Sequence, residues 1–201
     1  MLVKLIISTA VAYVIGGIPT GFIIGKLLKK VDIRRIGTKN IGATNVFHKI
    51  GKLPGITTFL LDTLKPVFVM WLSDTLKLVP QFLIPFVGAT AVVGNLWSPF
   101  LKFKGGRGLS STIGYFVYVM PRAVPLVAAI VFVITWLTKW NLPVGGLSLY
   151  IVGPIVAGRV YHYQRFVIIT TLYLGLFILI RQIPWMVIHL TDFYRRRRQS
   201  V

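Results

Sequence analysis

Two short polar loops contain the residues of this sequence whose types and spacing could do chemistry. Residues 32–45 read DIRRIGTKNIGATN, and residues 103–108 read FKGGRG. Both combine glycines, which free the backbone to present its N–H groups, with hydroxyl, amide or cationic side chains. Such donors are typical of a cradle for an anion, most often a phosphate. We therefore expect the two loops to converge on one phosphorylated substrate.

Each loop also has a plainer interpretation. A basic loop that only sets membrane topology would explain Arg34, Arg35 and Lys39, but not the dense Gly, Asn and Thr pattern of residues 37–45. The second loop lacks the spacing and the Lys-Ser/Thr ending of a Walker A motif. It precedes a helix expected from Leu109, however, and a helix N-terminus favours an anion. Anchoring by basic residues remains the alternative for the second loop.

The composition is that of an integral membrane protein. Hydrophobic residues make up 55% of the 201 residues, the mean hydropathy is +0.77, and only 13% of the residues are charged. Soluble domains carry about 25% charged residues, so lipid must cover much of this surface. The net charge of +19 could indicate nucleic-acid binding. Because the basic clusters alternate with long apolar stretches, contact with anionic headgroups is the better interpretation, and we expect no nucleic-acid partner.

Several kinds of chemistry are excluded by residue content. The chain has no cysteine, which rules out thiol catalysis, disulfides and cysteine metal sites. His48, His162 and His189 lie too far apart in the sequence for metal-ligand spacing. We therefore expect neither a metal nor a cofactor.

Apolar stretches bounded by charged residues or by Pro and Gly predict an all-α integral membrane protein with about seven transmembrane helices. Residues 109–120 are short enough to be re-entrant, which gives six spans as the alternative. The first stretch exceeds the apolar core of a signal peptide, about 7–15 residues. Residues 1–190 would form a single polytopic membrane domain, followed by a basic cytoplasmic tail, 191–201. The helices are expected at residues 3–28, 53–76, 81–97, 109–120, 123–138, 144–157 and 166–188.

Charge sets the expected orientation. With seven spans and the N-terminus outside, most of the 23 Lys and Arg residues lie on the cytoplasmic side, as the positive-inside rule requires. Both polar loops and the C-terminus then face the cytoplasm. An even number of spans would put the tail and the first loop on opposite faces, which the rule disfavours.

Some polar residues fall inside the predicted spans. Asp62 and Lys65 are three residues apart and share a helix face, where they either tie helices together or lie beneath a site. Arg181 is expected to extend to the headgroups rather than to reach the site. Arg195–Arg198 should contact anionic lipid. The glycines of residues 16–25 would let another helix, or a lipid chain, approach closely.

The two loops resemble signatures of the bacterial acyl-phosphate:glycerol-3-phosphate acyltransferases, the PlsY family. The first signature, DxRxxGxxNxGATN, is matched by Asp32, Arg34, Gly37, Asn40, Gly42, Ala43, Thr44 and Asn45. The second, GHxxPxFxxFKGGKG, is matched by Gly94, Phe100, Phe103, Lys104, Gly105, Gly106 and Gly108, with Arg107 for the lysine. Asp62 and Lys65 fall where the family carries DxxK. The resemblance covers roughly residues 10–180.

The chain also departs from the family pattern. Asn95 stands in place of the histidine of the second signature, and Ser98 in place of its proline. Gly17 replaces the serine of the SxP that precedes the first signature, and Thr38 and Lys39 replace its Ser-Gly. The third signature, a histidine-acid-asparagine block, does not follow Arg181. The sequence thus keeps the residues expected to hold phosphate and lacks several polar groups of the family.

The resemblance implies transfer of an acyl group from acyl phosphate to the 1-hydroxyl of glycerol 3-phosphate, giving lysophosphatidic acid for phospholipid synthesis. It implies a multi-pass protein of the bacterial inner membrane that acts as a monomer with these two substrates and membrane lipids. The acyl chain would lie beside the glycines of the first helix. The expected catalytic residues are Lys104, Asn45 and Thr44. The residues expected to bind phosphate are Arg34, Thr38, Asn40, Gly42, Ala43, Gly105, Gly106, Arg107 and Gly108.

Two other functions remain open from the sequence. A non-catalytic relative could bind a phosphorylated lipid precursor and regulate or scaffold lipid synthesis, because Asn95 cannot act as the family's histidine. A transporter is the third possibility, but the spans lack the internal repeat and the charged midplane cluster that transport often needs.

Overall fold

The protein is all-helical throughout the part that the structure describes, which is residues 1–137 and 142–199 of a computed structural model, with side chains described for 1–137 and 148–182. Short 3-10 turns lie at Ile33–Arg35, Gln81–Leu83 and Pro99–Leu101, and a π turn at Val156–Val160. The α-helices are α1 Leu2–Gly17, α2 Thr20–Lys29, α3 Ala43–Lys49, α4 Lys52–Thr75, α5 Ile84–Leu96, α6 Leu109–Val119, α7 Val124–Leu137, α8 Leu142–Ile155 and α9 Arg165–Gln199.

The first apolar stretch is interrupted after α1. A single helix was expected over residues 3–28, but Pro19 has no N–H to donate and separates α1 from α2. The carbonyl of Ile18 accepts the N–H of Thr20 at 3.0 Å, and Pro19 has φ −87° and ψ 74°, which is an inverse γ-turn. This break sets the direction of α2 toward the first polar loop.

The first polar loop contains more regular structure than the sequence predicts. Residues 29–52 were expected to be irregular, but they include the 3-10 turn and the seven-residue helix α3. Apolar side chains beneath the loop form a small separate cluster, made of Ile33, Ile41, Val46, Ile50 and Leu101. Leu101 comes from beside the second loop, so burial of this cluster brings the two polar loops together.

Helices α1 and α5 pack with their backbones in close approach. A Cβ at Gly16 would lie 1.9 Å from the carbonyl oxygen of Ala91, and one at Gly94 would lie 2.2 Å from that of Tyr13. The alternative that a lipid chain fills the space beside Gly16 is therefore wrong, because α5 occupies it. At Gly17 the space is taken by Pro99, whose Cδ would lie 2.6 Å from an added Cβ.

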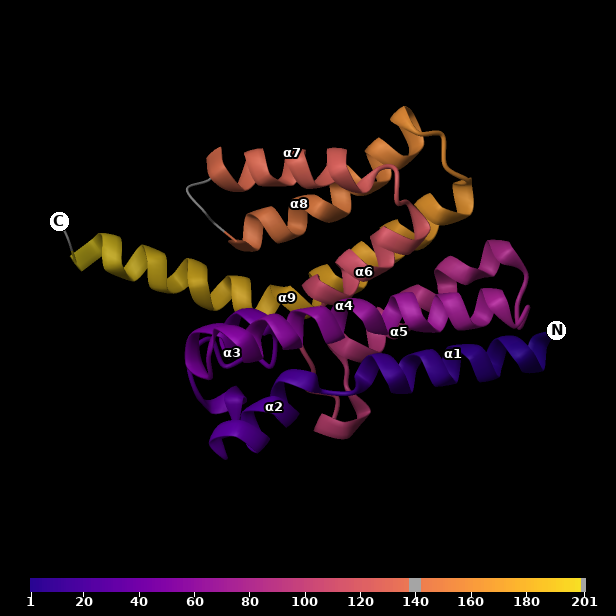
Figure 1. Cartoon of the computed structure of the whole chain (residues 1–201). Helices are drawn as coiled ribbons and strands as arrows, with labels where there is room; N and C mark the ends of the chain where they lie inside the picture. Colours follow the sequence, from indigo (N-terminus) through magenta and orange to yellow (C-terminus); the bar gives the residue numbers. More distant parts are fainter. Residues whose placement is uncertain (138–141, 200–201) are drawn as a thin grey trace.

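The main core surrounds α5. Figure 1 shows α1, α4 and α5 side by side, with α6 and α9 above them in the view and α7 and α8 as a further layer beyond. Helix α4 also contacts α6 closely, since a Cβ at Gly114 would lie 1.9 Å from the carbonyl of Thr63. This α4–α6 contact places the second polar loop, which directly precedes α6, against α4.

Four helical stretches are long and apolar enough to cross a membrane: Leu2–Lys29, Lys52–Thr75, Gln81–Leu101 and Arg165–Gln182. Shorter apolar helices cover Leu109–Val119, Val124–Leu137 and Ser148–Val160. Together they occupy the positions of the seven predicted helices, so the all-α, multi-pass prediction is confirmed. The number of crossings and their orientation stay predictions. Large apolar side chains such as Trp71 and Trp136 are exposed on these helices, as lipid contact requires.

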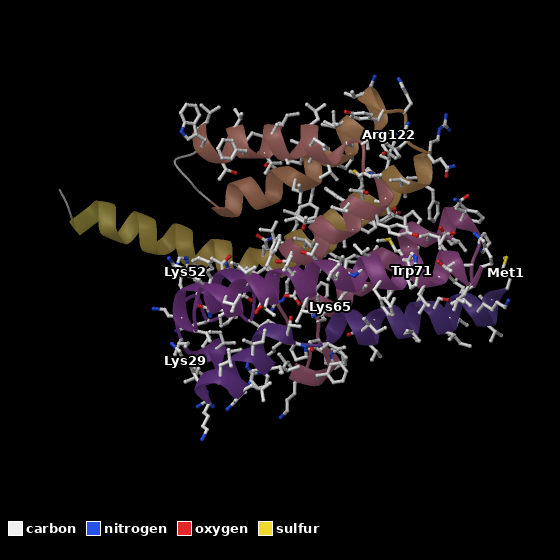
Figure 2. The ribbon with its side chains drawn as sticks, in the orientation of Figure 1. Met1, Lys29, Lys52, Lys65, Trp71 and Arg122 are labelled. Atoms are coloured by element: carbon white, nitrogen blue, oxygen red, sulfur yellow. The ribbon has the colours of Figure 1, made fainter. Side chains whose placement is uncertain are left out.

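Basic side chains gather at one end of the bundle. Figure 2 shows Lys29 and Lys52 near α2 and α3, while Met1 lies at the opposite end. Which of these two ends faces the cytoplasm stays a prediction. Helix α9 continues through most of the expected tail, residues 191–201. The side chains of this tail, with Arg195–Arg198 among them, and the side chain of His189 lie outside the described ones.

Candidate active site

The first polar loop is folded around the side chain of Asn45, which is only 2% exposed. Its amide oxygen accepts the N–H of Thr38 at 2.9 Å. Its amide nitrogen donates to the carbonyls of Ile33 at 2.9 Å, Ile36 at 3.1 Å and Asn40 at 2.8 Å. Asn45 was predicted to be catalytic; here its amide is committed to the backbone of its own loop, so it acts by shaping the loop.

Asp32 and Arg34 form a second brace in this loop. The carboxylate of Asp32 accepts the N–H of Arg34 at 3.0 Å, Nε at 3.0 Å and Nη2 at 2.8 Å. These bonds from Arg34 lower the pKa of Asp32 to about 2. The guanidinium also lies 4.8 Å from the ring centroid of Phe22. Arg34 was predicted to bind phosphate, but the structure gives its charge a partner inside the loop.

The remaining predicted residues of the first loop lie at its surface. Thr38 and Thr44 are exposed, and Asn40, Gly42 and Ala43 are half-buried. Once Asn45 and the Asp32–Arg34 pair have fixed the loop, these are the groups that can face an anion. Thr38, Asn40, Gly42 and Ala43 stay predicted phosphate-binding residues. Thr44, the exposed hydroxyl of the GATN segment, stays a predicted catalytic residue.

The second polar loop lies directly against the end of α5. The N–H of Gly105 donates to the carbonyl of Leu96 at 3.2 Å, and the N–H of Gly106 donates to that of Asn95 at 2.8 Å. These two N–H groups were expected to bind phosphate, and that expectation is wrong for this conformation because both are already paired. The glycines serve close packing instead: a Cβ at Gly105 would lie 2.1 Å from the carbonyl of Asn95.

Three cationic side chains remain at the second loop. Lys104 is exposed. Arg107 is half-buried, and burial, with the nearby charge of Arg181, lowers its pKa to about 10, so it stays charged at neutral pH. Arg181 comes from α9 and donates to the carbonyls of Leu96 at 3.3 Å and Gly105 at 3.1 Å. The expectation that Arg181 extends to the headgroups is therefore wrong.

Gly108 ends the second loop and begins α6. Its φ of +79° lies in the left-handed region, which favours glycine. The N–H of Thr112 donates to its carbonyl at 2.8 Å, as in a regular first turn. Gly108 therefore begins α6 as its N-cap residue, and its contact with a phosphate stays a prediction.

The two polar loops meet, as the sequence analysis expected. A Cβ at Gly106 would lie 3.6 Å from the side chain of Ile41, in the middle of the first loop. The backbone of Ile41 also packs against α2, since a Cβ added at Gly21 would lie 1.9 Å from the carbonyl oxygen of Ile41. Ile41 is therefore held between α2 and the second loop. Sequence reasoning missed this residue because it carries no chemistry of its own.

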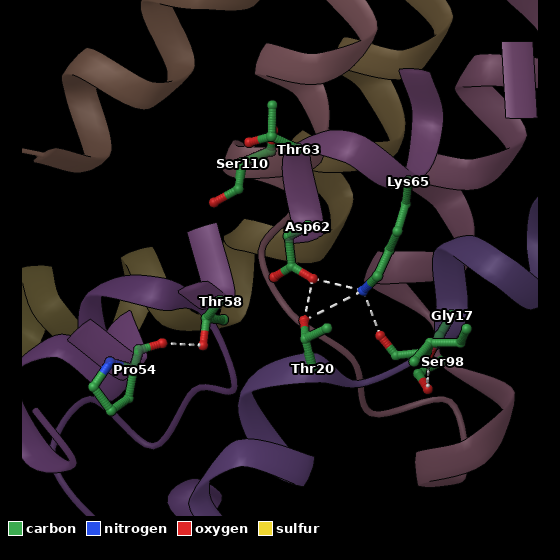
Figure 3. A network of polar contacts seen from close by, with 10 residues as sticks. Gly17, Thr20, Pro54, Thr58, Asp62, Thr63, Lys65, Ser98 and Ser110 are labelled. Carbon is green, nitrogen blue, oxygen red and sulfur yellow. Dashed lines mark hydrogen bonds and ion pairs between the residues drawn. The ribbon is translucent and has the colours of Figure 1, made fainter. Parts of the chain in front are cut away.

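Asp62 and Lys65 form a buried ion pair beneath the loops. Lys65 Nζ lies 2.6 Å from Asp62 Oδ1, and both side chains are 8% exposed. Lys65 also donates to the carbonyl of Ile18, and Thr20 donates to Asp62 (Figure 3). Of the two interpretations from the sequence, the one in which this pair ties helices together agrees with these bonds.

An apolar cavity opens beside the second loop, between α6, α7 and α8. Its volume is about 330 Å³. Leu109, which lines the cavity, directly follows Gly108 of the second loop. The lining is almost entirely hydrocarbon, so the cavity suits an apolar chain rather than a headgroup. Its residues are Leu109, Ile113, Phe116, Val124, Val127, Ala128, Val131, Phe132, Thr135 and Leu149. Among the residues whose side chains are described, no cluster of three or more His, Cys, Asp or Glu could hold a metal.

Known proteins resemble this chain in sequence. Residues 6–190 match the sequence family described as glycerol-3-phosphate acyltransferase. A glycerol-3-phosphate acyltransferase of Geotalea daltonii is 40% identical over 130 residues, which are 65% of each chain. A glycerol-3-phosphate acyltransferase 2 of Dehalococcoides mccartyi strain CBDB1 is 34% identical over 151 residues, 73% of this chain and 70% of the relative. The match thus spans about two thirds of the length of these relatives.

Solved structures agree with the sequence relatives. A crystal structure of PlsY, an integral membrane glycerol 3-phosphate acyltransferase, in its glycerol 3-phosphate form has a TM-score of 0.83 and 28% identity over 94% of this chain and 92% of that one. Its lysophosphatidic acid form has a TM-score of 0.80 and 26% identity. The matched family profile covers both polar loops, the ion pair and Arg181. Because the family match spans residues 6–190 and the fold agrees with a solved member, this chain belongs to the glycerol-3-phosphate acyltransferase family.

Proposed function

We propose that this protein transfers a fatty acyl group from acyl phosphate to the 1-hydroxyl of glycerol 3-phosphate, giving lysophosphatidic acid and phosphate. The observation that carries this proposal is the meeting of the two loops at Ile41 and Gly106, beside Arg107 and an apolar cavity. One place thus offers cations for phosphate and hydrocarbon for an acyl chain. As a multi-pass protein it would act in the bacterial inner membrane, and as a monomer, since all the proposed residues come from one chain.

The reaction needs no protein nucleophile, and the protein mainly has to position the two substrates. The substrate hydroxyl oxygen attacks the acyl carbonyl carbon, and the bond from that carbon to the phosphate oxygen breaks. The phosphate leaves with the electron pair and can take the hydroxyl proton. Because acyl phosphate is a mixed anhydride with a good leaving group, holding two anions in register and stabilising charge supply most of the catalysis.

The second loop is proposed to hold the phosphate that leaves. Lys104 is exposed and can swing toward a ligand, and Arg107 is half-buried and brings a planar, charged guanidinium that attracts an anion. Arg181 would act indirectly, since its bonds to Leu96 and Gly105 hold the loop that presents these cations. A positive charge from Arg181 also adds to the local attraction for an anion.

The first loop is proposed to hold glycerol 3-phosphate. Thr38, Asn40 and Thr44 would donate to its phosphate, with the backbone at Gly42 and Ala43 approaching closely. Asn45 and the Asp32–Arg34 pair would keep this surface in one shape. The acyl chain would enter the cavity between α6 and α7, where each buried methylene adds about 0.8 kcal/mol.

A non-catalytic role in binding a phosphorylated lipid precursor is favoured by one observation: Asn95, buried at the second loop, stands where the family carries a histidine. An amide cannot act as a general base at neutral pH. If the substrate phosphate takes the proton, as proposed above, this loss does not abolish the reaction.

The direct test is an assay of purified protein in detergent with palmitoyl phosphate and glycerol 3-phosphate. We expect lysophosphatidic acid and inorganic phosphate in equal amounts, and no product when palmitoyl coenzyme A replaces the acyl phosphate. Absence of product, together with saturable binding of glycerol 3-phosphate, would favour the non-catalytic role.

A further inference from the structure

Two Asp–Lys pairs with the same spacing but different surroundings lie on helix α4 and at its C-terminal end, where Lys77 is just past the last helical residue, Thr75. Asp74 and Lys77, at its C-terminal end, are 3.4 Å apart, and the Lys77 side chain is 82% exposed. Asp62 and Lys65 are 2.6 Å apart with both side chains buried. An ionisable pair inside a helix long enough to cross a membrane is costly, so the partners of Asp62 and Lys65 decide what the pair does.

The partners of the buried pair lie at the break between α1 and α2. The last carbonyls of α1 have no partner within their helix, and Pro19 has no N–H to offer. Lys65 Nζ donates to the carbonyl of Ile18 and lies 3.3 Å from Thr20 Oγ1. The hydroxyl of Thr20 donates to Asp62. Figure 3 shows these groups converging on Lys65 Nζ, which fixes both sides of the break to α4.

The break is joined to the first loop through α2. Gly21 follows Thr20, and its backbone lies against the carbonyl of Ile41 with no room for a Cβ. The side chain of Ile41 in turn faces Gly106 of the second loop. A shift of α2 against α4 must therefore move the first loop against the second.

The same turn of α4 also holds the far end of the second loop. Thr63, between Asp62 and Lys65, donates through its hydroxyl to the carbonyl of Ser110 at 3.2 Å, at the start of α6 (Figure 3). Its backbone carbonyl packs against Gly114 one turn later. One segment, residues 62–65, is thus bonded to the chain just before the first loop and to the chain just after the second.

We propose that residues 62–65 of α4 are the positioning element of the site. Asp62 and Lys65 set the α1–α2 break, Thr63 sets the start of α6, and together they fix the distance between the two phosphate-binding loops. None of these side chains is proposed to touch substrate. They act through Ile18, Thr20 and Ser110, so their loss should change the geometry of attack more than the binding of either anion.

The test uses the double variant Asp62→Asn/Lys65→Met, which removes both charges and leaves no unpaired buried ion. The matched control is Asp74→Asn/Lys77→Met at the second pair, where the asparagine oxygen can still accept the hydrogen bond that Tyr118 donates to Asp74. We expect the first variant to keep a melting temperature close to wild type, while kcat falls about 10–100-fold, as a displacement of about 1 Å would produce. The KM for glycerol 3-phosphate should change less than about threefold, because the cations remain. The control should match wild type in melting temperature, kcat and KM.

Hydrogen–deuterium exchange of the same proteins gives a readout that does not depend on turnover. We expect faster exchange in residues 37–45 of the Asp62→Asn/Lys65→Met variant and no change in the control. Wild-type kcat with unchanged exchange would show that the pair only joins helices, and would overturn the proposal. If the wild-type protein itself gives no product, the proposed reaction fails, while the exchange comparison still decides whether the pair positions the loop.

A milder variant covers the case in which the double variant does not fold. Thr20→Val removes the hydroxyl that joins Asp62 to the break and leaves both charges in place. Thr20→Ser keeps that hydroxyl. We expect kcat to fall about tenfold in the valine variant, since a lost buried hydrogen bond to a charged group has about that effect, and to be retained in the serine variant. Equal kcat values in the two variants would overturn the proposal.

Discussion

The hydroxyl of Ser98 donates a hydrogen bond to the backbone carbonyl of Gly17 at 2.6 Å, across 81 residues of sequence. Both residues depart from the signatures of the family: Gly17 stands in place of a serine, and Ser98 in place of a proline. The bond lies at the C-terminal end of α1, next to the break that Lys65 holds. Two departures that look independent in the sequence are therefore in contact in the structure.

This contact predicts that the two departures are coupled. In Gly17→Ser, the added Cβ would lie 2.6 Å from Pro99 Cδ, so we expect a loss of stability and activity. Ser98→Pro removes the bond to Gly17 and should also lower both. The double variant, which restores the family's residues at both positions, should lose less than the sum of the two changes by about 0.5–3 kcal/mol. Thermal melting of all four proteins measures this coupling, and strict additivity would show that the two positions are independent.

Close packing of the second loop predicts a large effect of one methyl group. In Gly105→Ala, the new Cβ would lie 2.1 Å from a backbone oxygen that cannot move without moving α5. We expect the loop to be displaced and kcat to fall by about 100-fold, as for a misplacement of about 1 Å. The control is Gly25→Ala in α2, whose Cβ would meet nothing closer than 3.5 Å. Turnover at wild-type level in Gly105→Ala would contradict the packing role.

The assignment of Lys104 to a phosphate predicts a change in substrate affinity. Lys104→Gln removes the charge and keeps most of the side chain. A hydrogen bond to a charged group is worth about 1.5–3 kcal/mol, so KM for palmitoyl phosphate should rise about 10–100-fold. Lys77→Gln, which removes an exposed charge at the other end of α4, should leave KM unchanged. Equal effects of the two substitutions would indicate a general loss of positive charge rather than a specific contact.

The apolar cavity predicts control over acyl-chain length. Ala128 lines the cavity, and Ala128→Trp should fill part of its volume of about 330 Å³. We expect kcat/KM for palmitoyl phosphate to fall at least tenfold relative to a shorter donor such as octanoyl phosphate, because long chains lose buried methylenes worth about 0.8 kcal/mol each. Ala129→Trp places the same side chain on an exposed neighbouring position outside the cavity lining. A chain-length preference that is the same in both variants would place the acyl chain elsewhere.

The Asp32–Arg34 pair predicts how the first loop responds to acid. Hydrogen bonds from Arg34 lower the pKa of Asp32 to about 2, compared with about 3.9 for an unfolded carboxyl group. The stabilisation by the pair is therefore fully present above about pH 4 and is lost as the pH falls through about 2. Nuclear magnetic resonance titration of the Asp32 carboxyl carbon should give a midpoint near 2, and Arg34→Gln should raise it. A midpoint near 4 in the wild-type protein would mean that the pair does not form.

The sequence alone determined the class of the protein and the positions of its seven apolar helical stretches, but not the break at Pro19 or helix α3. Transfer of apolar residues out of water adds up over a local stretch, so windows of the sequence report membrane helices without knowledge of their neighbours. The two polar loops were also visible, because their residue types are unusual in such a chain. Their resemblance to the PlsY signatures supplied the family, and the comparisons confirmed it.

Tertiary structure decided what individual residues in those loops do. Asn45 and Gly106 look like ligands in the sequence, yet their polar groups are used inside the protein. The partner of Arg181 lies 76 residues away at Gly105, and that of Lys65 lies 47 residues away at Ile18. A hydrogen bond depends on placing two atoms within about 3 Å, and no local pattern encodes that placement for residues so far apart. The sequence therefore identified the groups expected to bind phosphate, and only the fold showed which of them are already bonded inside the protein.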